Sequence, residues 1–519
     1  MRLFPMNSGQ ARARLVKAGA ALVAVALIAG CGNNNRPVVT PVTPSGPAAQ
    51  PLSFTTVVSS PSSTSPGVAS IIDYSGDTLL AEAFIGRGPI LFTIDETGTL
   101  GFTYNSDHTI TNFPVTDLLQ AKMETTTTLA NTAQPVNFYT PTSALWIADL
   151  TGNVADVFTG IPETFKVAVP VGTATVAAVS PVFVIGNGNY TAQRNYVVSQ
   201  NFLDPTGVAC NTSPTTAPAM GEITPVETAS YAADTPMSVG KCPVYAVMST
   251  DNRRIFVLNR GGDATNPGGS ITVINSQINT PDSCTPYQSQ NGQWVTCHPS
   301  IPLPAGPVYA EFNNTTQQLV VANYDSNTIS VIDVTLDQYG NDYNTYANPT
   351  CTVSGVTSYA NCGAITGGFG TTFTIPVGNN PASVTVLADG SRAYTANQTD
   401  GTVSIVNLTD HTVEKTLTVV GHPRTVVSTQ NSLYGKVYVA SPDSPYLTII
   451  STINDLVATT VLVEGNVVDV RVSTQNGSSG NNNDTSRMPG MGQPCTLPPG
   501  LEPTPTGSQT AWQVCQLMP

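Results

Sequence analysis

The sequence has few charged residues, and few of these are basic. Only 10% of its 519 residues are charged, with 19 basic residues against 33 acidic ones. Nucleic-acid binding depends on Lys and Arg side chains that neutralise phosphates, so the composition argues against a nucleic-acid partner. For the same reason, the protein surface itself is poorly suited to anionic lipid headgroups.

Several chemical motifs are also missing. The sequence has no Cys-x-x-Cys, no phosphate-binding glycine loop and no Gly-x-Ser-x-Gly nucleophile motif. Of its four histidines, His298 and His411 have no second histidine or carboxylate at ligand spacing. Acidic turns such as 325–328 and 399–402 are calcium-site candidates, but short acidic turns are more typical of hairpins. We therefore predict no metal, no cofactor and no assignable catalytic residue.

Long apolar runs are absent except near the start of the chain. The apolar run 18–30 follows a basic segment and is too short for a transmembrane helix, which is typical of a signal peptide. Residues 28–31, Ile-Ala-Gly-Cys, look like a bacterial lipobox. We therefore predict a signal peptide over 1–30 and a lipid on Cys31 that anchors the protein to a membrane. An ordinary signal peptide with an incidental cysteine is the alternative.

The residues after Cys31 refine this expected location. By resemblance to Gram-negative lipoproteins, Gly32 in place of Asp favours the outer membrane, on its periplasmic or its surface side. Residues 31–66 are rich in Pro, Thr and Asn without apolar periodicity, so we predict a flexible tether. Removal of the signal peptide leaves 15 basic and 33 acidic residues, a formal charge of −18 that we attribute to solubility.

Eight cysteines remain besides Cys31, and they fall in sequential pairs. Eight cysteines allow 105 connectivities, and neighbour pairing is the simplest. The predicted disulfides are Cys210–Cys242, Cys284–Cys297, Cys351–Cys362 and Cys495–Cys515. Disulfides persist in oxidising compartments, which agrees with a location in the cell envelope.

A phrase that begins with Pro and reaches Asn 16 positions later recurs along the chain. It occupies residues 243–259, 307–323 and 381–397, and a fourth copy begins at Pro423. Each copy is followed by a polar turn and another run of β-branched residues. Self-similarity of this kind indicates a repeat architecture.

One repeat contains four short runs rich in Val, Ile, Thr and Tyr, separated by turn residues. In the best-defined copy they span 382–387, 392–397, 402–407 and 413–420. Four antiparallel strands of this length form one blade of a β-propeller. With weaker units upstream, we predict an all-β fold: a β-propeller of seven four-stranded blades over 67–473. Six and eight blades are alternatives. Residues 467–473 are expected to close the ring on the first blade.

Three segments carry a likeness to a known family. Residues 320–334, 393–408 and 437–452 read VVANYDSNTISVIDV, AYTANQTDGTVSIVNL and VYVASPDSPYLTIIST. They resemble the YVTN family of β-propeller repeats, strongly across about 240–470 and faintly across 66–240. The resemblance implies a propeller, but it implies no single activity, because members range from surface-layer proteins to periplasmic and lactonase-like proteins.

The sequence varies where the inner strands begin. His422 and Arg424 flank Pro423, and Asn380 holds the equivalent position one unit earlier. Such positions gather around the central channel, where different side chains can converge on a ligand. Arg424 is a candidate anion clamp and His422 a candidate acid or base, with ordinary linker positions as the alternative.

The recurring Asn259, Asn323 and Asn397 are read as structural, because Asn tolerates left-handed turns and hydrogen-bonds the nearby backbone.

Insertions interrupt the repeats and are expected to lie on one rim of the frame. The segment 337–349 is rich in tyrosine, and Tyr339, Tyr343 and Tyr346 are candidate partner-binding residues. A decorative loop is the alternative. The Gly/Asn/Pro-rich residues 474–519 form a predicted tail with one disulfide.

These features favour a cell-envelope lipoprotein, monomeric, whose propeller is a binding or scaffold module for a protein or glycan partner. The alternative implied by the family resemblance is a lactonase-like hydrolase acting at the central channel. A propeller that carries a redox cofactor ranks last, because the haem motif is absent. Fold alone does not decide between these functions.

Overall fold

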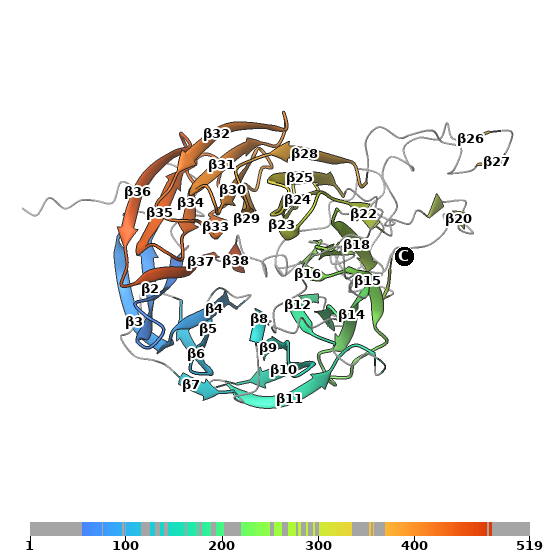
Figure 1. Ribbon diagram of the computed structural model, residues 1–519, viewed down its shortest axis with the longest axis horizontal. Helices are drawn as coiled ribbons and strands as arrows, with labels where there is room; N and C mark the ends of the chain where they lie inside the picture. The colour runs from blue at the N-terminus through green and yellow to red at the C-terminus, as the bar shows by residue number, and fades with distance from the viewer. Residues whose placement is uncertain are drawn as a thin grey trace, which may run out of the picture. The chain divides into compact units, whose positions relative to one another are not determined.

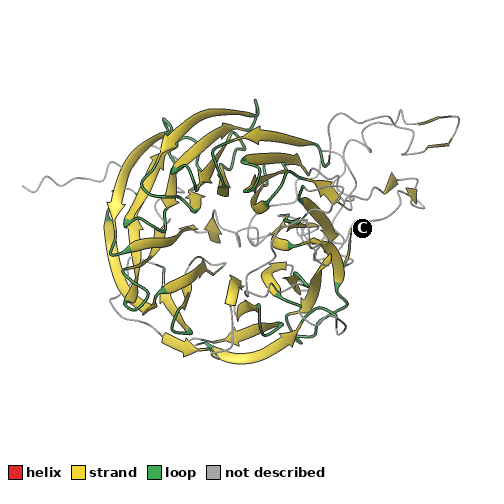
Figure 2. Cartoon of the chain, viewed as in Figure 1, coloured by secondary structure: helices red, strands yellow, loops and turns green. Residues whose placement is uncertain are grey.

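The described part of the chain consists of strands and the turns between them (Figure 2). The computed structural model describes residues 54–74, 76–95, 98, 100–115, 125–129, 135–139, 144–160, 163–173, 175, 179–187, 194–201, 220–249, 254–261, 268–276, 279–281, 287–288, 294–295, 300–334, 352–353, 356–357, 369–474 and 477–479. Within these ranges, no helix has the length and apolar character needed to cross a bilayer.

Eight antiparallel sheets of four or five strands follow one another around a ring (Figure 1). We number these blades 1 to 8 in chain order. The all-β propeller predicted from the sequence is confirmed, but the predicted number of seven blades is wrong: the ring has eight.

The first four blades contain strands β1 to β15. Blade 1 holds β1 (Phe54–Ser60), β2 (Pro66–Asp73) and β3 (Leu79–Arg87), and blade 2 holds β4 (Pro89–Ile94), β5 (Leu100–Asn105), β6 (Thr109–Pro114) and β7 (Thr125–Thr128). Blade 3 holds β8 (Pro135–Tyr139), β9 (Ala144–Asp149), β10 (Val154–Thr159) and β11 (Thr164–Pro170). Blade 4 holds β12 (Pro181–Asn187), β13 (Arg194–Ser199), β14 (Met220–Glu227) and β15 (Met237–Lys241).

The last four blades contain the recurring phrase. Blade 5 holds β16 (Pro243–Met248), β17 (Arg254–Asn259), β18 (Ser270–Asn275), β19 (Thr280–Pro281) and β22 (Ser300–Pro302), and blade 6 holds β23 (Pro307–Asn313), β24 (Gln318–Asn323), β25 (Thr328–Asp333) and β28 (Thr372–Pro376). Blade 7 holds β29 (Pro381–Val386), β30 (Arg392–Asn397), β31 (Thr402–Asn407) and β32 (Thr412–Thr418), and blade 8 holds β33 (Thr425–Ser428), β34 (Lys436–Ala440), β35 (Tyr446–Ser451) and β36 (Leu456–Leu462). Two small hairpins, β20 (Tyr287–Gln288) with β21 (Trp294–Val295) and β26 (Thr352–Val353) with β27 (Val356–Thr357), lie in the insertions.

Blade 1 is assembled from both ends of the described chain. Strand β37 (Asn466–Thr474) pairs with β1 from Ser60↔Asn466 to Phe54↔Ser473, and β38 (Gly477–Ser479) pairs with the other edge of β37. The predicted closure by residues 467–473 is therefore confirmed. The propeller begins at Phe54, within the stretch that composition assigns to the tether.

This shared blade explains the error in blade number. In the sequence alone, residues 68–84 and 90–95 read as one weak unit. In the structure, β2 and β3 belong with β1 and β37 in blade 1, whereas β4 starts blade 2. A linear search for complete units therefore misses one blade, because blade 1 has no contiguous copy in the sequence.

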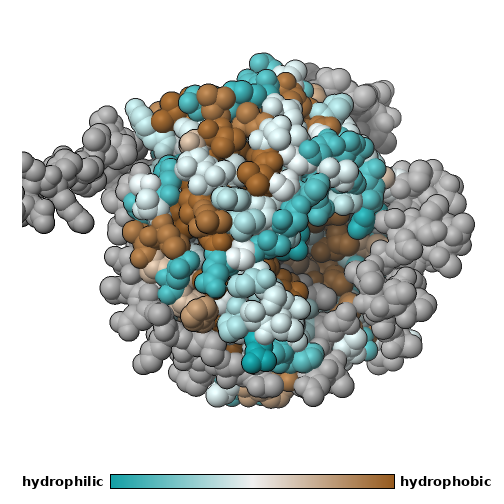
Figure 3. Space-filling view, turned by 60° about the vertical axis from the view of Figure 1, so that its left-hand side comes forward, coloured by the Kyte–Doolittle hydropathy of each residue, from teal (hydrophilic) through white to brown (hydrophobic). Residues whose placement is uncertain are grey.

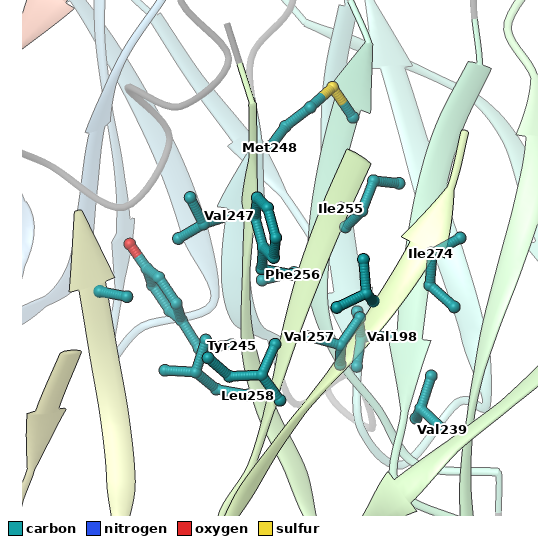
Figure 4. Packing of buried hydrophobic residues seen from close by; sticks show 14 of the residues in the cluster. Val198, Val239, Tyr245, Val247, Met248, Ile255, Phe256, Val257, Leu258 and Ile274 are labelled. Carbon is teal, nitrogen blue, oxygen red and sulfur yellow. The ribbon is translucent and has the colours of Figure 1, made fainter. Parts of the chain in front are cut away.

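Each sheet buries side chains on both faces, since neighbouring blades cover it on both sides. Successive side chains of β17 point to opposite faces of the blade. Figure 4 shows Ile255 and Val257 on the side of Val198 from blade 4, whereas Phe256 and Leu258 point away. All five are at most 1% exposed, and burying such a side chain contributes roughly 1.5–3 kcal/mol. The core therefore consists of apolar layers between successive blades.

The ring has two distinct faces. The proline face is the end at which the inner strands begin, at Pro89, Pro181, Pro243, Pro307 and Pro381. The opposite face carries the turns from first to second and from third to fourth strands.

The insertions leave from both faces. Residues 202–219 follow the second strand of blade 4 on the proline face, whereas 335–368 follow the third strand of blade 6 on the opposite face. The two insertions therefore start from different faces, and most of the residues within them lie outside the described ranges, so their placement on one rim stays a prediction.

Candidate functional site

Several inner strands begin with the same backbone conformation on the proline face. In five blades the residue before the proline has a left-handed backbone: Gly88, Ser180, Cys242, Gly306 and Asn380. Proline fixes its own φ and needs no ladder partner for its nitrogen. The strand register shifts just after each of these prolines, so the next residue forms a β-bulge at the inner edge of the sheet.

The bulge position distinguishes blade 8 from the others. The residues at this position are Ile90, Val136, Val182, Val244, Val308, Ala382, Arg424 and Val468. Seven are aliphatic and one is a cation. At this bulge position, Arg424 is therefore the one charged residue among the eight.

Arg424 connects three blades. Its guanidinium Nη2 donates to the carbonyl of Val468 in blade 1, at 2.7 Å. Its own carbonyl accepts a hydrogen bond from Ser383 Oγ in blade 7, at 2.9 Å. The side chain is exposed. Arg424 thus helps hold the ring together while part of its charge faces solvent.

His422 forms an exposed pair with Asp443 from the turn between β34 and β35. The backbone N–H of His422 donates to Asp443 Oδ1 at 2.8 Å, and its Nδ1 lies 2.5 Å from Oδ2. The side chains are 62% and 48% exposed. Burial opposes ionisation of Asp443, but the hydrogen bonds from His422 outweigh it and lower the pKa of that carboxyl.

Asn380 faces blade 6. Its Nδ2 donates to the carbonyl of Tyr324 at 3.2 Å, and its Oδ1 accepts from Thr399 Oγ1 at 2.6 Å. Its N–H donates to Asn327 Oδ1 at 2.9 Å. The structure therefore places Asn380, His422 and Arg424 on the proline face of adjacent blades. Among the described contacts, each is bonded to other residues and none to another member of the trio.

A polar chain that the sequence analysis missed links blades 5, 6 and 7 on the same face. Arg260 donates two hydrogen bonds to Asp325, at 3.1 and 2.9 Å, and its guanidinium lies 5.7 Å from the Tyr324 ring centroid. The Tyr324 hydroxyl donates to Gln398 Oε1 at 3.1 Å. Arg260 directly follows Asn259 of the repeated phrase, which is the sequence signal that would have located it.

The acidic turns considered for calcium already have protein donors. Asp325 accepts from Arg260, and Asp400 accepts from the N–H and Nδ2 of Asn379 at 2.7 and 2.8 Å. These two hydrogen bonds lower the pKa of the Asp400 carboxyl. In the described ranges, no three His, Cys, Asp or Glu side chains group as metal ligands.

The repeated asparagines tie the second strand of each blade to its third strand. The Nδ2 of Asn397 donates to Thr402 Oγ1 at 3.0 Å and to Ser404 Oγ at 2.9 Å, both on the adjoining strand. A Cβ on Gly378, just before the blade, would lie 2.6 Å from this side chain. Asn105, Asn259 and Asn323 make the same pair of hydroxyl contacts. Their structural role is as expected, but they lie in strands rather than in left-handed turns.

Blade 3 replaces this asparagine and its hydroxyl partner with two carboxyls. Asp149 occupies the asparagine position and Asp156 the serine position, and both are nearly buried, at 5% and 9% exposure. Burial, and then the charge of Asp149, raise the pKa of Asp156 to about 6. Burial also raises the pKa of Tyr104, with the charge of Asp149 contributing.

On the opposite face, buried polar clamps join successive blades. Arg392 in blade 7 pairs with Asp455 in blade 8 at 2.5 Å, and the Tyr394 hydroxyl donates to the same carboxylate. Lys436 in blade 8 pairs with Asp77 in blade 1 at 2.5 Å. These four charged side chains are only 16–19% exposed. The basic residues start the second strands of their blades, a spacing the sequence analysis did not use.

Several predicted residues fall outside the described ranges. Tyr339, Tyr343, Tyr346, the lipidation site Cys31 and seven of the eight remaining cysteines are among them. Cys242 is described: it is fully buried and disulfide-bonded. Its partner lies outside the described residues, so the four pairings remain predictions.

Comparison with known proteins shows the fold alone. No family model matches the chain, and no curated protein matches it. Apo AztD from Citrobacter koseri is similar in structure, with a TM-score of 0.50 and 13% identity over 83% of this chain and 99% of that chain. A second crystal structure of AztD gives a TM-score of 0.50 with 12% identity, over 81% and 97% of the two chains.

The dihydro-heme d1 dehydrogenase NirN, in complex with DHE, has a TM-score of 0.51 and 14% identity, over 85% of this chain and 78% of that chain. These likenesses agree with the class that the strands define, a β-propeller. At such low identities they carry no activity to this chain.

Proposed function

We propose that this protein is an envelope-anchored lipoprotein whose eight-bladed propeller is a binding module for a protein or glycan partner. One observation carries the binding role. The residues that brace the blades repeat from blade to blade, whereas the side chains around Pro423 and its equivalents differ. A fixed frame that presents different side chains on one face is how rigid scaffolds commonly support recognition.

The proposed anchor rests on the sequence. The apolar run 18–30 and the Ile-Ala-Gly-Cys motif support removal of a signal peptide and lipidation of Cys31. The outer membrane is the proposed location, from Gly32. The even number of remaining cysteines, with Cys242 in a disulfide, supports an oxidising compartment.

Binding is favoured over the lactonase-like alternative because of how the candidate residues are held. His422 is paired with Asp443 at an exposed surface, and Arg424 is bonded to the Val468 carbonyl. A hydrolase needs an acid or base within reach of an activated nucleophile or an electrophilic group. The described contacts join His422, Arg424 and Asn380 to the frame instead of to one another.

The binding role is tested by capture from envelope extracts. The double variant His422→Ala/Arg424→Ala should retain at least about tenfold less partner than the wild type, since each lost polar anchor costs on the order of 1 kcal/mol or more. Phe165→Ser, which alters an exposed residue at the opposite-face end of blade 3, is the control. Protease treatment of the extract distinguishes a protein partner from a glycan. Equal retention by all variants would exclude the proline face as the binding surface.

The insertion 337–349 needs a separate variant. Replacing it with Gly and Ser tests the candidate tyrosines without touching the proline face. Loss of partner in this variant alone would assign recognition to the insertion. If neither this variant nor His422→Ala/Arg424→Ala loses the partner, both proposed binding surfaces are excluded.

The anchor is tested by incorporation of labelled fatty acid. The wild type and Cys495→Ser should take up label and sediment with membranes, whereas Cys31→Ser should take up none. Label in Cys31→Ser, or none in the wild type, would contradict lipidation at this residue.

A further inference from the structure

Exposed apolar side chains gather on the opposite face of blades 8 and 1. The side chains are Leu433 at 68%, Ile453 at 66%, Leu80 and Leu456 at 46%, Tyr434 at 40% and Leu79 at 39% exposure. We call these six residues the apolar patch. Figure 3, which brings the side of blades 8 and 1 forward, shows several hydrophobic areas there. Apolar residues that gather on a surface mark a contact with another molecule or a membrane more often than scattered ones do.

Hydrogen bonds hold together the three turns that carry the patch. The turn 431–434 lies at its centre: the Tyr434 carbonyl accepts from the Tyr74 hydroxyl of blade 1 at 2.5 Å, and the Asn431 carbonyl accepts from Thr452 Oγ1 at 2.9 Å. Leu79 follows the first contact in sequence, and Ile453 follows the second. The patch therefore spans a junction between two blades, not one strand.

Charges beside the patch are neutralised within the protein. Asp77, two residues before Leu79, pairs with Lys436, and Asp455, between Ile453 and Leu456, pairs with Arg392. The free energy needed to bring a carboxylate near lipid is lower when the carboxylate is paired with a cation than when it is unpaired. Asp77 and Asp455 therefore do not oppose contact between the apolar patch and an apolar surface.

The chain enters the propeller at the same place. Phe54 starts β1 in blade 1 and pairs with Asp73, next to the turn that contains Tyr74 and leads to Leu79. Twenty-two residues lie between Cys31 and Phe54. A flexible chain of this length has an end-to-end distance of about 25 Å. A lipid on Cys31 would therefore spend most of its time nearer this face than the proline face.

We propose that the apolar patch rests on the lipid bilayer that holds the Cys31 anchor, with the proline face directed away from the membrane. This inference rests on the proposed lipidation. The patch supplies a second, weaker membrane contact that sets orientation, because acyl chains alone fix distance but not rotation. The lipid contact is with zwitterionic headgroups and acyl chains, since basic residues are scarce.

Site-specific photocrosslinking in the full chain tests the orientation. A benzophenone amino acid replaces Leu433 or Leu456 in the patch, or Phe165 or Met220 as controls with 58% and 51% exposure on blades 3 and 4. After irradiation in membranes, lipid adducts at Leu433 and Leu456 should exceed those at the controls at least tenfold.

Each other outcome has a definite meaning. Equal lipid adducts at all four positions, adducts of the patch with a second copy of the chain, or adducts with another protein would overturn the lipid assignment. The mass of the mature N-terminus is measured on the same samples. An acylated Cys31 with no patch preference overturns only the orientation, whereas an unacylated chain overturns the proposed anchor.

Discussion

The two faces of the ring use the same kinds of side chain in different settings. On the opposite face, Arg392 and Asp455 form a pair that is nearly buried between blades. On the proline face, His422 and Asp443 form a pair of similar length that is about half exposed. Buried pairs are costly to break, whereas exposed pairs add little to stability. The pair on the opposite face therefore stabilises the frame, whereas the pair on the proline face can vary in the service of recognition.

The largest effect is expected from breaking a clamp on the opposite face. Asp455→Ala removes the partner of both Arg392 and Tyr394 and leaves a guanidinium almost buried without its carboxylate. The free energy of unfolding should fall by about 3 kcal/mol, measured by chemical denaturation. Asp443→Ala is the matched control, and equal losses in both variants would contradict the distinction between the faces.

A smaller effect, dependent on pH, is expected from blade 3. Asp156 has a pKa near 6 when folded, against 3.8 for an unperturbed group. The folded protein therefore keeps a proton that the unfolded chain has lost, so the wild type loses stability as pH rises from about 4 to 6 and does not regain it above. Asp156→Ser, which copies Ser404, should remove about 2 kcal/mol of this loss.

The measurement is the thermal midpoint of both proteins from pH 4 to pH 7.5. The variant should be more stable at pH 7.5, with the difference shrinking towards pH 4. Ser404→Asp is the converse control, which should bring the same pH dependence into blade 7. Parallel curves for wild type and Asp156→Ser would refute the raised pKa.

A third effect on stability is expected from the repeated asparagines. Asn397→Ala removes the two hydrogen bonds to Thr402 and Ser404 between the second and third strands of blade 7. The expected loss is about 1–2 kcal/mol, because buried hydroxyls lose a donor. Asn379→Ala, which removes an exposed contact to Asp400, is the control. Urea midpoints that move equally in the two variants would show that burial does not decide their contributions.

The smallest effect on stability is expected on the proline face itself. His422→Ala should change the free energy of unfolding by less than about 1 kcal/mol, because the pair it forms with Asp443 is exposed. Differential scanning calorimetry measures this. A loss as large as that of Asp455→Ala would place His422 in the frame.

The sequence predicts the fold well where one blade is one contiguous copy. The phrase at 243–259, 307–323 and 381–397 locates inner strands that begin at Pro243, Pro307 and Pro381 and second strands that end at the repeated asparagines. It fails in blade 1, whose strands come from residues 54–87 and 466–474. The pairing of residues 467–473 with the first blade was predicted, but local periodicity does not mark where the strands of blade 1 end and those of blade 2 begin.

The candidate site was only partly predictable for a related reason. His422, Arg424 and Asn380 were found because they depart from the repeat, and they do lie on one face. Their partners Asp443, Val468 and Tyr324 come from other turns or other blades. The clamps were missed because Arg392 and Lys436 look like ordinary surface charges until the next blade is placed beside them.

The blade made from both chain ends has a consequence for biosynthesis. Ser59 donates a hydrogen bond to the carbonyl of Glu464, 405 residues away in the chain. Closing a loop of that length costs about 5 kcal/mol of chain entropy, and the last pairing restores contacts only when β37 arrives. A polypeptide released before residue 474 would carry an unpaired edge on β1, a target for aggregation and proteolysis. Only a chain that extends to residue 474 covers that edge, so closure of the ring distinguishes such a chain from shorter fragments.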